Sequence, residues 1–167
     1  MLMRNQDGVV WISEASLDDM VVEAEHLYPF ETGGALIGYW VKQYDEVVVT
    51  NATGPGPGAV HLPDSFLPDD EYQESEIARF YNMSGRLHTY LGDWHTHPGA
   101  SSYLSRRDKC TLRKVAKSRD ARAPIPIMAV LGGGPKWELK VWRYVPTKLD
   151  RFGFRVKISH LRAQTYS

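Results

Sequence analysis

The sequence has a single cysteine, no long hydrophobic run and no excess of charge of either sign, and each absence excludes a class of protein. Cys110 alone cannot build a disulfide framework or a cysteine-based zinc knuckle. No apolar run approaches the roughly 20 residues that span a bilayer, and the N-terminus lacks the apolar core of a signal peptide. We therefore expect a cytoplasmic protein without a membrane partner.

The zero net charge hides an asymmetry along the chain. Lysine and arginine total 20, as do aspartate and glutamate, which excludes a globally basic protein, so no nucleic acid is expected as a partner. Residues 1–83 hold 15 acidic and 3 basic side chains, a net charge of −12, whereas residues 84–167 hold 5 and 17, a net charge of +12. Two opposed halves of this kind can still present charged surfaces to a partner.

The length of 167 residues and the hydrophobic fraction of 43% predict one globular domain over residues 1–167. Short β-branched and aromatic runs predict strands at residues 9–12, 33–41, 46–50, 89–97, 124–131, 136–144 and 154–159. Apolar periodicity predicts helices at residues 17–27, 69–81 and 105–118, with Ser16 as the N-cap of the first. A Gly-Pro-Gly-Pro-Gly run predicts a loop over residues 53–68. This order predicts an α/β (α+β) fold with a mixed central β-sheet and flanking helices.

The residues that carry chemistry lie at the end of the strand predicted at 89–97. His95 and His97 are two positions apart, so their imidazoles lie on the same face of a strand. Two nitrogens alone make a poor zinc site, because catalytic zinc usually takes three protein ligands and a water. Asp108, on the helix that follows, can supply the third ligand.

Asp108 has two interpretations. It shares the apolar stripe of its helix with Leu112, Val115 and Ala116, and a carboxylate that faces the core is costly unless it is paired or binds a metal. The spacing from Ser105 to Asp108 is also typical of a helix N-cap with an acidic residue in the first turn, which needs no metal. Both interpretations stay open on spacing alone.

Two separated motifs resemble the JAMM (JAB/MPN) metalloprotease family. The sequence His-Thr-His-Pro at residues 95–98, followed by Ser105 and Asp108, resembles its metal-binding signature, and residues 31–38, Glu-Thr-Gly-Gly-Ala-Leu-Ile-Gly, resemble its upstream E-x-G-G-x-L-x-G segment. The resemblance spans about residues 8–145 and implies a JAB/MPN-like single domain. It implies that His95, His97 and Asp108 bind Zn²⁺, that Glu31 moves the proton from water to the leaving amine, and that Ser105 stabilises the oxyanion.

The resemblance also implies a class of substrate. Many members of the family cleave isopeptide or peptide bonds after the C-terminal tail of ubiquitin-like proteins, which lies extended beside a strand. Residues 91–98 are similar to those of bacterial stand-alone members such as the deconjugating proteases of CBASS anti-phage operons. The implied activity is that of a zinc-dependent isopeptidase or peptidase. Its substrate would be a ubiquitin-like protein or a conjugated cGAS-like nucleotidyltransferase, and the loop at residues 53–68 could flank the bound tail.

Two other functions remain as alternatives. A metal-free MPN scaffold would assemble partners without cleaving them, which the intact motif residues argue against. A RadC-like protein would associate with DNA through the basic half. That branch typically contains His-Asn-His-Pro-Ser-Gly, whereas residues 95–100 of this chain are His-Thr-His-Pro-Gly-Ala. This difference argues against the RadC-like alternative.

Several residues near the motif are expected to have supporting roles. Asp93 shares the strand face of the two histidines and could orient a metal ligand, whereas Trp94 and Thr96 should point into the core. We interpret the other four histidines, His26, His61, His88 and His160, as structural or surface residues, and Cys110 as an ordinary helix residue. The basic side chains around Asp108 could steer an acidic conjugate toward the site.

Overall fold

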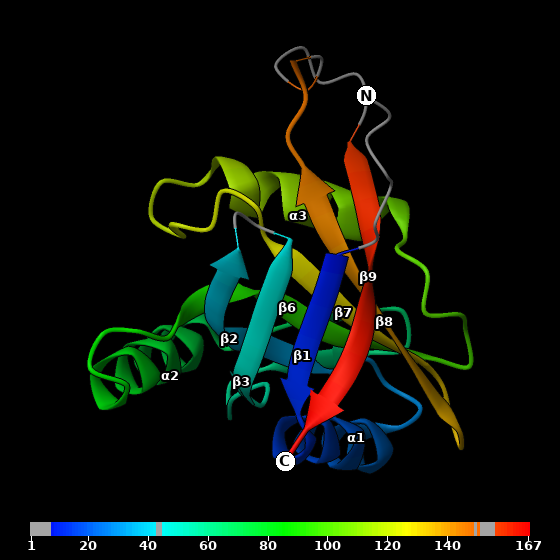
Figure 1. Cartoon of the computed structure of the whole chain (residues 1–167). Helices are drawn as coiled ribbons and strands as arrows, with labels where there is room; N and C mark the ends of the chain where they lie inside the picture. Colours follow the sequence, from blue (N-terminus) through cyan, green and yellow to red (C-terminus); the bar gives the residue numbers. More distant parts are fainter. Residues whose placement is uncertain (1–7, 43–44, 149, 151–155) are drawn as a thin grey trace.

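Seven strands form a closed barrel with three helices packed on it, as the computed structural model shows for residues 8–42, 45–148, 150 and 156–167 (Figure 1). The barrel strands are, in spatial order, β1 (Gly8–Ser13), β3 (Glu46–Ala52), β2 (Gly33–Lys42), β6 (Thr89–Pro98), β7 (Ile127–Gly133), β8 (Trp137–Val145) and β9 (Lys157–Tyr166). The helices are α1 (Glu14–Leu27), α2 (Asp70–Met83) and α3 (Arg106–Lys117). Among the described residues, no helix has the length and apolar content needed to cross a membrane.

The strand pairing confirms the predicted mixed sheet with flanking helices. Strand β1 runs parallel to β3 and β9, and β6 runs parallel to β7, whereas the remaining neighbours are antiparallel. The last strand is longer than the sequence predicts: β9 continues to Tyr166, and residues 154 and 155 lie outside the described part of the chain. By pairing with both β8 and β1, β9 closes the barrel.

Two local predictions are wrong. The first helix begins one turn earlier than expected, because the Ser13 hydroxyl accepts a hydrogen bond from the Ser16 backbone N–H at 3.2 Å and caps the helix. Ser16 is a buried helix residue whose hydroxyl bonds to the Thr50 carbonyl. The segment 53–68 is not all loop, since β4 (Val60–Leu62) and β5 (Ser65–Leu67) pair as a small hairpin. The Gly-Pro run at residues 54–58 is free of helix and strand, as predicted.

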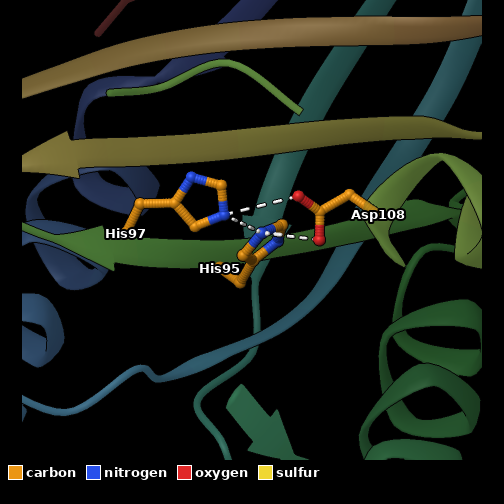
Figure 2. A group of neighbouring side chains, drawn as sticks. All are labelled: His95, His97 and Asp108. Carbon is orange, nitrogen blue, oxygen red and sulfur yellow. Dashed lines mark hydrogen bonds and ion pairs between the residues drawn. The ribbon is translucent and has the colours of Figure 1, made fainter. Parts of the chain in front are cut away.

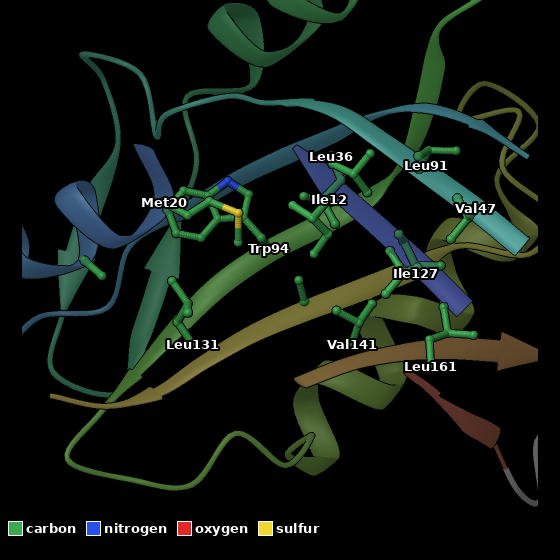
Figure 3. Close-up of a cluster of buried hydrophobic side chains, with 14 residues drawn as sticks. Ile12, Met20, Leu36, Val47, Leu91, Trp94, Ile127, Leu131, Val141 and Leu161 are labelled. Carbon is green, nitrogen blue, oxygen red and sulfur yellow. The ribbon is translucent and has the colours of Figure 1, made fainter. Parts of the chain in front are cut away.

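Alternate residues of β7 face two separate apolar clusters. Ile127, Ala129 and Leu131 belong to the larger cluster (Figure 3), together with residues of α1 such as Met20 and Ala24. The residues between them, Met128 and Val130, pack with Leu112 of α3 on the other face of the strand. Burial on both faces explains why this strand is a continuous apolar run rather than an alternating one. The apolar periodicity that predicts the first helix is confirmed, because Met20 and Ala24 of α1 are buried in the larger cluster.

The pairing of β2 with β6 brings the acidic and basic halves of the chain together. Gly33 is the register partner of His95, so Glu31, two residues before β2 begins, is brought to the end of β6 that carries the two histidines. A Cβ on Gly33 would lie 2.2 Å from the Trp94 carbonyl oxygen, and one on Gly34 would lie 2.2 Å from the Thr53 carbonyl oxygen. Neither approach leaves room for a side chain, so the two glycines after Glu31 permit the close packing of β2 at this point.

Candidate metal centre

His95, His97 and Asp108 converge from two elements that are separated by a loop. Both histidines come from the end of β6 and point to the same face, and Asp108 reaches them from the first turn of α3 (Figure 2). The two Nε2 atoms lie 3.0 Å apart, and they are 3.2 Å (His95) and 3.4 Å (His97) from the Asp108 carboxylate oxygens. The three potential ligand atoms lie within 4.8 Å of one another. The structure therefore brings together the three residues that the motif implies.

The hydrogen bonds around the cluster orient its ligand atoms. The His97 ring lies with Nδ1 2.9 Å from the Ser101 carbonyl oxygen, to which it donates, so Nε2 keeps its lone pair toward the cluster. Burial alone would raise the pKa of Asp108, but the His95 and His97 rings beside its carboxylate and the hydrogen bond from Ser105 outweigh this effect and hold that pKa well below its usual range. Asp108 therefore stays negatively charged and attracts a cation.

Asp108 both caps α3 and faces the two histidines, so both interpretations of its spacing apply. Its Oδ2 accepts a hydrogen bond from the Ser105 backbone N–H at 2.7 Å, and its own N–H donates to the Ser105 hydroxyl at 3.1 Å. This reciprocal pair is a capping box, which stabilises the start of α3. The box also fixes the direction of the carboxylate, so the helix cap and the cluster depend on the same side chain.

The residues of the cluster fit a metal ion. Two imidazole nitrogens and one carboxylate oxygen form the donor set of a catalytic zinc site, in which the fourth position is left for water or substrate. A positive charge between the two facing Nε2 atoms and the Asp108 carboxylate would be attracted by all three groups. His95, His97 and Asp108 line a cavity of about 710 Å³, which gives the open position access to a substrate.

Glu31 and Ser105 line the same cavity as the cluster. Burial raises the pKa of Glu31, the nearby Asp108 and Asp64 carboxylates add to this rise, and the two histidines oppose it. A carboxylate whose pKa is raised toward neutrality is better suited to accept and return a proton. The Ser105 hydroxyl accepts its hydrogen bond from Asp108, so its own proton remains available to a group in the cavity.

Two of the supporting residues make contacts that the sequence does not indicate. Asp93 lines the cavity but accepts a hydrogen bond from the Tyr90 hydroxyl at 2.8 Å, and burial raises the pKa of Asp93 to about 6. His61, which we interpreted as a structural or surface residue, has Nδ1 2.8 Å from the carbonyl oxygen of Glu31. No spacing in the sequence indicates this contact, because the two residues are 30 positions apart and meet only through the hairpin. Trp94 and Thr96 are buried in the core, as predicted.

Some of the basic side chains near Asp108 form ion pairs. Asp150 Oδ1 lies 2.7 Å from Arg113 Nε and 3.8 Å from Lys117 Nζ. Within the described part of the chain, no ion pair involves the four other cations of α3. Arg107 donates to the Asp64 carbonyl at 3.4 Å. The other three, which we call the cationic face, are Arg106, Lys109 and Lys114. Of these three residues, Arg106 lines the cavity, so the cationic face reaches the cavity through that side chain.

Comparisons with known proteins agree with this geometry. A sequence profile of the family described as "Prokaryotic homologs of the JAB domain" matches residues 13–145. A protein of Sinorhizobium fredii named "Probable metalloprotease y4qB" is 39% identical over 160 residues, which cover 95% of this chain and 97% of the relative. A "CD-NTase/cGAS isopeptidase" of Enterobacter hormaechei is 29% identical over 127 residues, covering 74% of this chain and 67% of the relative.

More distant similarities extend to a proteasome subunit and to a solved structure. The "26S proteasome regulatory subunit RPN11" of Encephalitozoon cuniculi is 28% identical over 147 residues, which cover 86% of this chain and 48% of that protein. The solution structure of protein DSY2949 from Desulfitobacterium hafniense matches with a TM-score of 0.67 and 17% identity, covering 95% of this chain and 94% of that one. At that identity the match supports the fold alone.

Proposed function

The chain belongs to the family of prokaryotic homologs of the JAB domain, the JAMM family, and is a hydrolase of the metallopeptidase type; on that premise we propose that it is a zinc-dependent isopeptidase. The single observation that carries the proposal is the convergence of His95, His97 and Asp108 in the cavity that Glu31 also lines. The segment that begins at Glu31 and the His-Thr-His-Pro motif that begins at His95 lie about 60 residues apart in sequence. The register of β2 with β6 therefore decides whether they meet.

In the proposed mechanism, His95, His97 and Asp108 hold the metal. When bound, zinc supplies a Lewis acid that polarises the scissile carbonyl and lowers the pKa of a bound water toward about 7. Glu31 accepts a proton from the attacking water and returns it to the nitrogen of the leaving amine, so the hydrolysis is balanced in protons. The Ser105 hydroxyl donates a hydrogen bond to the oxygen that becomes negative as water adds to the carbonyl.

We propose that the bond cut lies after the C-terminal tail of a ubiquitin-like protein or of a protein conjugated in the same way. Three relatives are named "CD-NTase/cGAS isopeptidase", which favours a nucleotidyltransferase conjugate as the substrate. We propose that this conjugate belongs to bacterial anti-phage defence. Such a conjugate would be met in the cytoplasm, so the proposal includes that location. The retained ligand set favours this enzyme over a metal-free scaffold.

The proposal is tested by comparing the wild-type protein with a Glu31→Gln variant. Both proteins are purified, and their metal content is measured by elemental mass spectrometry. Each protein is then incubated with a panel of ubiquitin-like fusions and a nucleotidyltransferase conjugate. Intact-mass spectrometry then identifies the bond that is cut. We expect equal zinc content and a loss of cleavage by about 100-fold or more in the variant, because general acid–base catalysis contributes about 10²–10⁴-fold.

Removal of the metal gives the second arm of the test. Incubation with a chelator should abolish cleavage, and added zinc should restore it. A wild-type protein that holds no metal and shows no chelator-sensitive cleavage of any substrate in the panel would overturn the proposed function.

A further inference from the structure

Glu31 lies outside the regular structure that holds the other residues of the site. His95 and His97 are part of β6, and Asp108 is part of α3, whereas β2 begins only at Gly33. The ladder between β2 and β6 therefore begins two residues after Glu31. Thr32 is bonded to Thr96 of β6 through its backbone N–H and carbonyl, but the N–H and carbonyl of Glu31 itself need contacts of their own if its carboxylate is to keep one position in the cavity.

The β4–β5 hairpin supplies contacts to both backbone groups of Glu31. Its N–H donates to the Leu62 carbonyl oxygen at 2.9 Å, and its carbonyl oxygen accepts a hydrogen bond from His61 Nδ1 at 2.8 Å. The His61 ring is itself held, because it stacks on Phe66 across the hairpin with ring centroids 5.6 Å apart and planes 23° apart. The carbonyl of Glu31 can only accept, so a neutral His61 must carry its proton on Nδ1.

We infer that His61 is a positioning residue for Glu31. The peptide that follows the Cα atom of Glu31 is held at one end by the Thr32 N–H, which donates to the Thr96 hydroxyl at 3.0 Å, and at the other by His61 Nδ1, which donates to the Glu31 carbonyl. With both bonds made, the plane of this peptide and the direction of the Glu31 side chain are fixed. The inference rests on the proposed role of Glu31 as the group that moves the proton. Its consequence is a loss of turnover on substitution, because a misplacement of about 1 Å can cost on the order of 100-fold in rate.

Other roles for His61 do not fit its surroundings. It is not one of the three clustered ligands, and it does not line the cavity, so it does not touch the metal or the substrate there. Its contact with a backbone carbonyl engages the nitrogen nearest the main chain. His61 therefore acts through Glu31 rather than on the reacting atoms.

Three variants separate positioning from folding. His61→Leu removes the donor, whereas His61→Asn keeps one, since the amide nitrogen of asparagine is the same number of bonds from the backbone as Nδ1. His160→Leu is the matched control, because His160 packs against Trp142 on β8 and does not line the cavity. On a fusion that the wild-type enzyme cleaves, we expect His61→Leu to lower kcat about 10- to 100-fold, with KM and zinc content unchanged. His61→Asn should recover kcat to within about threefold of wild type, since the amide restores the donor, and His160→Leu should be unaffected.

Nuclear magnetic resonance gives a readout that does not depend on cleavage. Nitrogen-15 spectra of the wild-type protein should show His61 as the Nδ1–H tautomer at neutral pH, and the Glu31 amide should exchange with solvent faster in His61→Leu than in wild type or His61→Asn. If the panel of fusions is not cleaved by any variant, the proposed function fails and these spectra still decide the role of His61.

Several results would overturn the inference. An Nε2–H tautomer would remove the donor on which it depends, and unchanged Glu31 amide exchange in His61→Leu would show that the contact does not hold the backbone. Unchanged kcat in His61→Leu, in an enzyme that Glu31→Gln inactivates, would reject the positioning role and leave the proposed function intact. Equal losses in His61→Leu and His61→Asn would reject the hydrogen bond as the cause.

Discussion

Replacing Ser105 by alanine and Asp108 by asparagine should separate the two roles of the Asp108 carboxylate. In the wild-type protein the Ser105 N–H donates to Asp108 at 2.7 Å, and the Asp108 N–H donates to the Ser105 hydroxyl at 3.1 Å. Ser105→Ala removes the hydroxyl and weakens the helix cap, but leaves the carboxylate beside the histidines. Asp108→Asn keeps a side-chain oxygen for the Ser105 N–H, but removes the negative charge that faces His95 and His97.

The sizes of the two effects follow from the interactions removed. Without metal, Ser105→Ala should lower the free energy of unfolding by about 1 kcal/mol, the usual cost of losing a serine N-cap. Zinc at 100 times its dissociation constant should raise that free energy by about 2.7 kcal/mol in the wild-type protein and equally in Ser105→Ala. If the loss of one of three ligands weakens binding about 100-fold, the same zinc concentration stabilises Asp108→Asn by only about 0.4 kcal/mol.

The assay is thermal unfolding of the three proteins in a chelator and in zinc. For a domain of this size, 1 kcal/mol corresponds to about 2–4 °C in Tm, so zinc should raise the wild-type Tm by about 5–11 °C. A zinc-induced rise in Asp108→Asn as large as that of wild type would refute Asp108 as a ligand. An unchanged Tm of Ser105→Ala in chelator would refute the stabilising role of the cap.

Two further predictions concern the packing of β2 and the cationic face. Gly33→Ala should destabilise the protein by about 1–3 kcal/mol, the usual cost of overpacking. Its Cβ would lie 2.2 Å from the Trp94 carbonyl oxygen. Differential scanning calorimetry should therefore show a lower Tm. Gly54→Ala, whose Cβ would meet nothing within 4 Å, is the control and should leave Tm nearly unchanged. Glutamate in place of both lysines of the cationic face should slow association with an acidic conjugate at low salt and have little effect at high salt. Stopped-flow association rates that are independent of these changes would remove the steering hypothesis.

Local patterns in the sequence predict much of the site. The spacing of two places His95 and His97 on one face of a strand, because successive strand residues alternate between faces. The position of Asp108 in the apolar stripe of its helix predicts a buried carboxylate, and the structure shows it buried beside both rings. The same local rules missed the start of α1 by one turn, because serine residues at 13 and 16 both satisfy the requirements of a cap and the choice depends on where β1 ends.

The sequence by itself determined which side chains could act together: two histidines on one strand face, a carboxylate on the helix that follows, and a distant Glu-x-Gly-Gly segment. Tertiary structure alone decided that Glu31 meets them, since this depends on the register of Gly33 with His95 across 62 positions of chain. It also decided that β9 closes the barrel against β1 and that His61 contacts Glu31. Periodicity specifies which face of an element is buried, but it carries no information on which distant element covers that face, because long-range pairing is selected by the packing of the whole chain.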